Sequence, residues 1–497
     1  MREPFPVNPT LDFIPIASVQ LDTDCRDELI PIMAGLQYLY TNTSSRDQLL
    51  ALIAKDINGT TSALLGREGM SYWEIAVLAG VRLGCNLDYD KLQLLAHEHF
   101  TLRRIMGIGI WEDGRKECRR FNWKRIEANV CKLRPETVEK LNEFVVGVGH
   151  DLVPQAAEKV RGDSFVVETN IHYPTEANVL ADGLRKVILL AAVIAGVLGL
   201  EGWRQQKHLL RRIKNYLRTI NQECKSKRAG VVERRRQAYR PYLKLARKLL
   251  RRARDLVRQV QEESLGWVVG NVEVMGQVAE LEKYLSLSER VAENARRRVM
   301  KGESVPNEEK IFSVFEPHTE LINRGKSPNP IEFGRRTLLL EDSVGFIVHY
   351  EVCERGKTDQ DRGVEALRRA QEKVGGKIKS ASFDRGFHSP KNQVDFAEIV
   401  SNACIPVRGY KQAARQEAEA TKDYKQSRRN HPGVESLINS VQVGNGLDRC
   451  RDRSERGLKR YVGLAVLGRN IQVLGRLVLA QSQPESEAAK TRRKQPA

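Results

Sequence analysis

Apolar residues recur at steps of three and four positions through the first 150 residues, a period typical of amphipathic helices. The pattern is clearest over residues 47–55 and 73–83. Ser71 is a candidate N-cap for the second of these helices, because Glu74 stands three positions later and can complete a capping box. We therefore expect residues 1–150 to form a helical N-terminal domain.

A short turn after Gly84 separates this helix from a further amphipathic stretch over residues 89–99, for which Asn86 or Asp88 is the candidate cap. Helix, short turn and helix form the outline of a DNA-binding helix-turn-helix. The same outline is common in bundles that only pack or dimerise. Both interpretations stay open. A cluster of cations with interleaved aromatic residues follows over residues 103–125.

The apolar period changes from that of helices to that of β-strands beyond residue 160. Strand-like segments cover residues 163–169, 334–340, 345–352, 377–384 and 403–407. Helical segments alternate with the later strands at residues 359–374, 391–400 and 434–441. Strand, insertion, hairpin, helix, strand, helix, strand, helix is the order of the ribonuclease H-like fold. We expect an α/β catalytic core of this kind, a mixed sheet with flanking helices, over residues 151–183 and 304–480.

A long helical stretch, residues 184–303, interrupts this core as an insertion. One of its apolar stripes runs through Leu210, Ile213, Leu217 and Ile220. The segment Lys-Ser-Lys-Arg-Ala-Gly at 225–230 is the candidate turn between two of the helices. The final segment, 481–497, is rich in Gln, Glu, Lys and Arg, and we expect it to be disordered.

Positive charge is concentrated in the insertion. The chain has a formal net charge of +19 and a pI near 9.6, and residues 204–258 contain 20 Lys and Arg against three acids. A helix face this one-sided repels itself unless a polyanion lies on it, so we expect contact with DNA; a solvated face is the alternative. The candidate DNA-binding arginines are Arg211, Arg212, Arg234, Arg235, Arg236, Arg251 and Arg252, with Arg428 and Arg429 beyond the insertion.

Three acids stand where such a fold can bring them together. Asp163 opens the first strand segment, Asp384 ends another, and Glu435 lies in a helical stretch. Hard cations such as Mg²⁺ prefer oxygen ligands. Two such ions can hold the attacking and leaving oxygens of a phosphodiester. A single acid is more often a solvated surface group or a cap. Together the three are candidate catalytic residues and ligands of two Mg²⁺ ions.

Other acids compete for these roles. Glu168 and Glu176 are alternatives to Asp163 as the first acid. Glu168 lies five residues along the same strand, so it faces the other side of the sheet if the strand is regular. Asp359 follows Gly356-Lys-Thr at the start of a predicted helix, which favours a role as its N-cap.

The remaining composition argues against secretion and against a membrane role. The eight cysteines are scattered without a Cys-x-x-Cys pair, and no histidine pair has zinc spacing, which predicts reduced thiols in the cytosol. The N-terminal residues lack the apolar core of a signal peptide. The longest apolar run, residues 187–200, has 14 residues and is too short to span a bilayer. We expect a cytoplasmic protein.

Several segments are similar to one family. They are residues 163–175, 315–320, 382–390 and 431–439, with further similarity at 69–73, 102–109, 446–452 and 459–470. On these segments the chain resembles the DDE transposases of bacterial insertion sequences, most closely the group labelled ISNCY. The resemblance covers residues 60–475. It departs from related transposases at Gln442, where a lysine is expected, and at Glu176, where an aspartate is expected.

The resemblance implies a ribonuclease H-like domain in which Asp163, Asp384 and Glu435 hold two Mg²⁺ ions, with Mn²⁺ as a substitute. It implies hydrolysis of a phosphodiester at the ends of an insertion sequence, followed by strand transfer into target DNA. The expected partner is double-stranded DNA, and the expected assembly on DNA is a homodimer or larger. The expected location is the bacterial cytoplasm, at the nucleoid. His388 and His431 would orient ligands, or simply cap and pack.

Two other functions remain possible from the sequence. The chain is either a catalytically silent DNA-binding protein derived from a transposase, or a nuclease of the same fold that acts on RNA. The presence of all three acids argues against the first alternative. Aromatic residues make up only 6% of the chain and form no RNA-stacking motif, which argues against the second.

Overall fold

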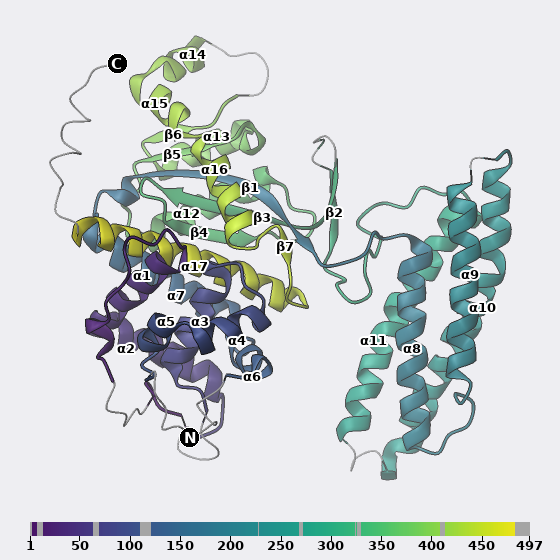
Figure 1. The fold of residues 1–497 in the computed structure, drawn as a ribbon. Coiled ribbons are helices and arrows are strands. Elements are labelled where there is room, and N and C mark those ends of the chain that lie inside the picture. Colours follow the sequence, from purple (N-terminus) through teal and green to yellow (C-terminus); the bar gives the residue numbers. More distant parts are fainter. Residues whose placement is uncertain are drawn as a thin grey trace. The chain divides into compact units, whose positions relative to one another are not determined.

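The computed structural model describes residues 2–6, 13–62, 69–109, 121–226, 228–267, 272–323, 325, 330–407 and 413–482. The chain forms two compact units (Figure 1). Unit 1 contains residues 1–168 and 335–497, and unit 2 contains residues 169–334. The segment 110–120, which carries part of the cation cluster after the predicted helix-turn-helix, lies outside the described residues. So do residues 483–497 of the predicted tail 481–497.

The N-terminal part of unit 1 is helical, as predicted. Its helices are α1 (Leu29–Thr41), α2 (Thr43–Asn58), α3 (Tyr72–Gly84), α4 (Tyr89–Glu98), α5 (Phe100–Ile105), α6 (Trp123–Val130) and α7 (Pro135–Leu152). The capping box of Ser71 and Glu74 at the start of α3 is confirmed. Asp88, not Asn86, caps α4, since its side chain accepts a hydrogen bond from the Lys91 backbone.

The helix-turn-helix outline is formed by α3 and α4. Every residue of α3 is buried. The exposed positions of α4 carry acids, Asp90 and Glu98, as well as Lys91 and Leu94. A helix that reads DNA presents a basic or polar face to the phosphates. These two helices therefore favour the interpretation as a packing element.

The helix α17 (Glu455–Ser482) packs against α1, α3 and α7 in unit 1. Glycines allow a close backbone approach: Gly468 lies against the backbone of Gly84, and Gly475 lies against that of Pro31. One hydrophobic core is shared by the N-terminal helices, the sheet and α17. The N-terminal helices, expected as a domain of their own, are thus part of the same compact unit as the sheet.

Among the described residues, α17 is also the one helix that is long and apolar enough to cross a membrane. By burial it is a core helix: residues such as Leu464, Val466 and Leu474 have at most a trace of exposed surface. Its neighbours α1, α3 and α7 cover much of it, as in a helix of a protein core.

The sheet is mixed and has the strand order β2-β3-β1-β5-β6 in the part of the chain that the structure describes, with β4 paired to β3 and β7 paired to β1. The strands are β1 (Lys159–Thr169), β2 (Glu320–Asn323), β3 (Ile331–Asp342), β4 (Ile347–Val352), β5 (Ser380–Phe383), β6 (Asn402–Cys404) and β7 (Arg449–Cys450). The predicted hairpin is formed by β3 and β4, which are antiparallel. β1 and β5 are parallel, and so are β5 and β6.

Helices follow the later strands: those predicted at 359–374, 391–400 and 434–441 are present, and two helices between residues 413 and 430 were not predicted. The helices are α12 (Asp359–Lys373), α13 (Pro390–Ile399), α14 (Ala413–Ala420), α15 (Lys422–Asn430) and α16 (Gly433–Asn439), which continues as a short π-helix over Ser440–Gly444. The N-cap of α12 is Thr358, which forms a capping box with Asp361. The expectation that Asp359 is the cap is therefore wrong by one position: Thr358 is the N-cap, and the Asp361 carboxylate accepts from its backbone N–H and its hydroxyl.

Unit 2 is built from long helices around a core of its own. They are α8 (Glu176–Val197), α9 (Gln206–Lys225), α10 (Val231–Trp267) and α11 (Val272–Ala295). The helices begin at residue 176, earlier than the predicted 184. The turn predicted at 225–230 is confirmed, and Gly230 closes it with φ +72°, a conformation that glycine adopts at little cost. Ile213 and Ile220 of the predicted stripe are buried.

Candidate functional site

The parallel pairing of β1 and β5 brings two of the predicted acids to neighbouring positions. Gly162 of β1 pairs with Phe383, the last residue of β5, so Asp163 in the middle of β1 lies beside Asp384, which directly follows β5. Neighbouring strands lie about 4.8 Å apart, and residues paired across a sheet point to the same face. The side chains of Asp163 and Asp384 thus lie on one face of the sheet, at the carboxyl end of β5.

Each of the two acids is held locally while part of it stays accessible. Asp163 is half-buried, and its Oδ1 accepts a hydrogen bond of 2.7 Å from the Ser164 backbone N–H. Asp384 ends β5 in an extended conformation and precedes a short 3₁₀ turn over Arg385–Phe387. Its side chain is 55% exposed, which leaves carboxylate oxygens open to a ligand.

His431 and Arg428 lie beside Asp384. Nε2 of His431 lies 3.5 Å from Oδ1 of Asp384, and Nη2 of Arg428 lies 3.9 Å from the same oxygen. The His431 imidazole and the Arg428 guanidinium lower the pKa of Asp384 below its ordinary value, against the opposing effect of partial burial. The other ring nitrogen of His431, Nδ1, lies 3.2 Å from Oγ of Ser382. The buried imidazole therefore bridges β5 and the carboxylate that ends it.

His388, the other predicted histidine, has a different environment. Its Nε2 lies 3.4 Å from Oε1 of Gln393, and its backbone carbonyl accepts a hydrogen bond of 2.6 Å from Gln360. These contacts hold the start of α13 and the loop before it. The packing interpretation therefore fits His388, whereas the orienting interpretation fits His431.

Glu435 lies in the first turn of α16 with an exposed side chain. The start of α16 rests on β1, where Gly433 lies against the guanidinium of Arg161. That guanidinium also donates a hydrogen bond of 3.0 Å to the Asn430 carbonyl at the end of α15. Both contacts anchor the corner between α15 and α16 on β1, the strand that contains Asp163.

Within the described residues, no group of three or more His, Cys, Asp and Glu side chains could hold a metal ion. The structure thus pairs Asp163 with Asp384 and brings the helix of Glu435 to the same strands. Convergence of all three carboxylates on metal ions stays a prediction.

The competing acids are engaged elsewhere. Glu168 forms an ion pair of 2.6 Å with Arg449 of β7. Asp359 lies 2.7 Å from Arg336 of β3. Glu176 belongs to unit 2, where it pairs with Arg298. An acid already neutralised by an arginine is a poor candidate for a metal ligand, which favours Asp163 as the first acid.

Arg161 and Glu341 lie next to the candidate site but were not predicted from the sequence. The guanidinium of Arg161 donates to Oε2 of Glu341 at 2.6 Å, and burial raises the pKa of that carboxyl, partly offset by the arginine. The alternation of a strand was the available signal, because Arg161 stands two positions before Asp163 and therefore on the same face. A polar cavity of about 310 Å³ lies along this face, lined by Lys159, Arg161, Ser380, Ser382, Ser427 and Asn430 among others.

The predicted DNA-binding arginines fall into two groups. Arg211, Arg212, Arg251, Arg428 and Arg429 are exposed. Arg252 is half-buried and lies over the ring of Trp203, with 4.7 Å from its Cζ to the ring centroid.

The triplet Arg234, Arg235 and Arg236 requires a correction. Arg234 forms an ion pair of 2.8 Å with Glu223, Arg235 donates to the Cys224 carbonyl at 3.0 Å, and Arg236 donates to the Val299 carbonyl at 3.3 Å. All three side chains, which the sequence places among the candidate DNA-binding arginines, are half-buried. They tie α10 to α9 and to the π-helical turn Arg296–Met300 that follows α11, so replacing them would loosen unit 2.

Comparisons with protein-family models, with curated proteins and with solved structures found no match for this chain.

Proposed function

We propose that the chain is a DDE transposase, which binds the ends of an insertion sequence, hydrolyses a phosphodiester there and transfers the strand to target DNA. The observation that carries the proposal is the parallel register of β1 and β5, which sets Asp163 beside Asp384. The order of β1, the unit 2 insertion, the β3–β4 hairpin, α12, β5, α13, β6 and α16 agrees with a ribonuclease H-like core.

The proposal includes a pair of Mg²⁺ ions, with Mn²⁺ as a substitute, and two observations support it. Asp384 is ionised at neutral pH, its carboxylate is accessible, and Asp163 supplies a second set of hard oxygen ligands from the next strand. Glu435 would complete the set from α16. When bound, two such ions would make a water nucleophilic and neutralise charge on the leaving oxygen.

The protein's own residues would set the geometry of the reaction. His431, held by Ser382, would fix the orientation of the Asp384 carboxylate. Arg428 and Arg429, both exposed at the end of α15, would hold a phosphate of the DNA strand close to the acids. These two arginines would supply the positive charge that position 442 lacks, because Gln442 stands where a lysine is expected. A homodimer or larger assembly on DNA, in the bacterial cytoplasm, belongs to the same proposal.

The test is to separate binding from chemistry at Asp384. Asp384→Asn keeps the shape of the side chain but removes the anionic oxygen, so binding to DNA that flanks the gene should stay within about twofold. Mg²⁺-dependent cleavage should fall at least 10²-fold, the scale on which loss of one charge-stabilising group acts. Asp395→Asn, on α13, is a matched control and should cut normally.

The alternatives predict different results in the same assay. A wild-type protein that binds this DNA but never cuts it in Mg²⁺ or Mn²⁺ would be a silent DNA-binding protein. Preferential cleavage of RNA would point to a ribonuclease. An Asp384→Asn variant that cuts at the wild-type rate would remove Asp384 from the site altogether.

A further inference from the structure

The helices α9 and α10 of unit 2 form an antiparallel hairpin whose register is set by three contacts. Tyr216 and Tyr242 have ring centroids 6.2 Å apart. Arg234 pairs with Glu223 at 2.8 Å, and Arg235 donates to the Cys224 carbonyl at 3.0 Å. The three contacts give the same antiparallel alignment of α9 and α10 to within one residue. This alignment shows which residue of α10 lies beside each residue of α9.

Each helix carries a row of four exposed cations, with successive steps of four, three and four residues. The α9 row is Lys207, Arg211, Lys214 and Arg218, and the α10 row is Arg240, Lys244, Arg247 and Arg251. Steps of three and four residues keep side chains on one face of a helix. The buried positions, among them Ile213 on α9 and Tyr242 on α10, lie on the opposite faces. Both rows therefore point away from the bundle core.

The hairpin register puts the two rows at the same height. Arg218 is level with Arg240, Lys214 with Lys244, Arg211 with Arg247, and Lys207 with Arg251, by the register that joins Tyr216 to Tyr242. At 1.5 Å per residue each row is roughly 17 Å long. A duplex carries one phosphate per about 1.7 Å of its axis. A duplex segment as long as one row therefore carries roughly ten phosphates.

These eight side chains are not neutralised within the described part of the protein. None of them forms an ion pair or hydrogen bond with another described residue. The acids along the same stretch are used by other arginines: Glu223 pairs with Arg234, Glu233 with Arg236, and Asp255 with Arg258. Arg254, just beyond the α10 row, pairs with Glu289 of α11. Among the described residues, the two rows thus carry unpaired positive charge, as do other exposed cations of the hairpin such as Arg212 and Lys248.

We propose that this double row, on the α9–α10 hairpin, is the surface on which unit 2 holds duplex DNA, through the phosphates of its two strands. The inference deepens the DNA-binding part of the proposed function and does not depend on catalysis. Two level rows on neighbouring helices suit two backbones, whereas a single strand would engage one row. Phosphate contacts of this kind position a duplex without reading its bases.

The experiment replaces each row by glutamine in the full-length protein. The variants are Lys207→Gln, Arg211→Gln, Lys214→Gln and Arg218→Gln together; Arg240→Gln, Lys244→Gln, Arg247→Gln and Arg251→Gln together; and all eight. Glutamine is a good helix former, so the exposed changes should preserve the helices, which circular dichroism checks. The control removes four exposed cations of unit 1, namely Lys140, Lys357, Arg368 and Lys377.

The readout is the slope of log K against log salt for a 30-bp duplex of arbitrary sequence. Each row variant should flatten the slope by about 3.6 if all four cations contact phosphates, and the eightfold variant by about twice that. The control should leave the slope close to wild type. Because Asp384→Asn should keep this binding, failure of the double row and failure of the catalytic proposal are distinguishable.

Two results would overturn the proposal. One is an eightfold variant whose affinity and slope match those of the unit 1 control, which would make the rows a solvated surface. The other is tighter binding of duplex RNA or single-stranded DNA than of duplex DNA by the wild-type protein, which would assign the surface to a different nucleic acid.

Discussion

The side chain of Glu351 on β4 lies between His349 of the same strand and Arg362 of α12. Oε1 of Glu351 is 2.5 Å from Nη2 of Arg362, and its Oε2 is 3.9 Å from Nε2 of His349. Burial opposes ionisation of Glu351, but the imidazole and the guanidinium outweigh it and lower its pKa to about 2. Burial also lowers the pKa of His349, so folding disfavours the charged form of that imidazole.

This pKa shift predicts a pH dependence of stability. The pKa of Glu351 is lower in the folded chain than in the unfolded one, where it is about 4.3. Folding therefore favours the ionised form, and the stabilisation is complete above about pH 5 and lost as the pH falls toward 2. Glu351→Gln should cost about 2 kcal/mol at neutral pH, and the gap to wild type should narrow on acidification.

Denaturant unfolding at several pH values measures this gap, with the exposed Glu354→Gln as the control. A gap between Glu351→Gln and wild type that stays constant from pH 7 to pH 2.5 would contradict the assigned pKa shift.

Individual residues of the site were predictable where local periodicity decides their position. Asp163 precedes a β-branched run and Asp384 follows a strand-like segment, so the sequence alone places both acids in or beside strands. The partners of Arg234 were not predictable, because Glu223 lies across a turn whose register depends on the packing of two helices. His431 was predicted only as one of two choices, since its contact with Ser382 joins segments 49 residues apart.

At the scale of elements, α17 depends on glycines where it crosses α1. A Cβ at Gly475 would overlap the backbone carbonyl of Pro31, which has no flexible side chain to move aside. Gly475→Ala should therefore destabilise unit 1 by about 1–3 kcal/mol. Gly147→Ala on α7 is the matched control: nothing lies within 4 Å of the added methyl, and alanine should stabilise that helix by about 0.5–1 kcal/mol.

Thermal unfolding of both variants measures the difference. Equal melting temperatures for the two variants would mean that α17 does not approach α1 through Gly475.

The order of the core elements was predictable, and the role of α17 was not. Alternating apolar positions and turn residues mark β3, β4 and α12 locally. By contrast, the apolar residues of α17 are spread around the helix, a pattern that indicates burial but not which helices cover it. The short strands β2 and β7 were also not predicted, because segments of four and two residues are too short to show a recognisable periodicity.

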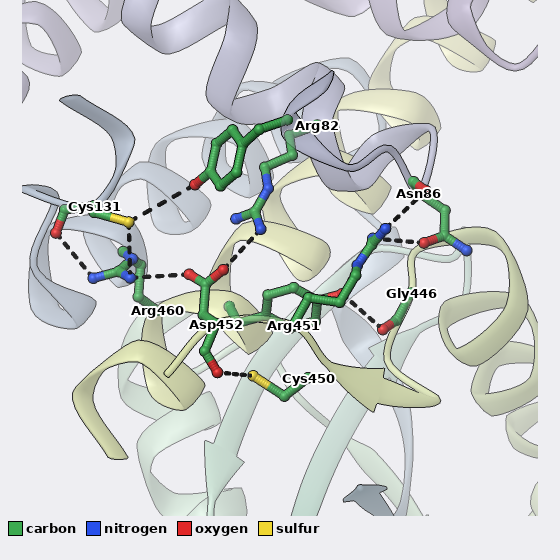
Figure 2. A network of polar contacts seen from close by, with 10 residues as sticks. Arg82, Asn86, Cys131, Gly446, Cys450, Arg451, Asp452 and Arg460 are labelled. Carbon is green, nitrogen blue, oxygen red and sulfur yellow. Dashed lines mark hydrogen bonds and ion pairs between the residues drawn. The ribbon is translucent and has the colours of Figure 1, made fainter. Parts of the chain in front are cut away.

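At the scale of the whole molecule, a buried charged network joins the two ends of unit 1 (Figure 2). Asp452 accepts from Arg82 of α3 at 2.7 Å and from Arg460 of α17 at 2.9 Å. Arg460 also donates to the Cys131 carbonyl, at 2.9 Å. Removing one member of such a network leaves buried charge uncompensated. These contacts help to hold the N-terminal helices and the C-terminal part of unit 1 together in one compact unit.

The two units divide the proposed activity between them. Unit 1 contains the acids and their positioning residues, and unit 2 contains the double row of cations. The sequence predicted this division from charge alone, because the cations of residues 204–258 form one block. It could not predict which cations are exposed in rows, since that depends on the hairpin register of α9 and α10.

The central claim, that the paired aspartates hold divalent cations with Glu435, is tested most directly by counting bound Mn²⁺. Electron paramagnetic resonance of the protein on duplex DNA should detect two ions per wild-type chain. Asp163→Asn and Asp384→Asn should each reduce affinity for both ions at least tenfold, Glu435→Gln should weaken at least one of them, and Asp395→Asn should change neither. Full occupancy by two ions in both aspartate variants would contradict the account.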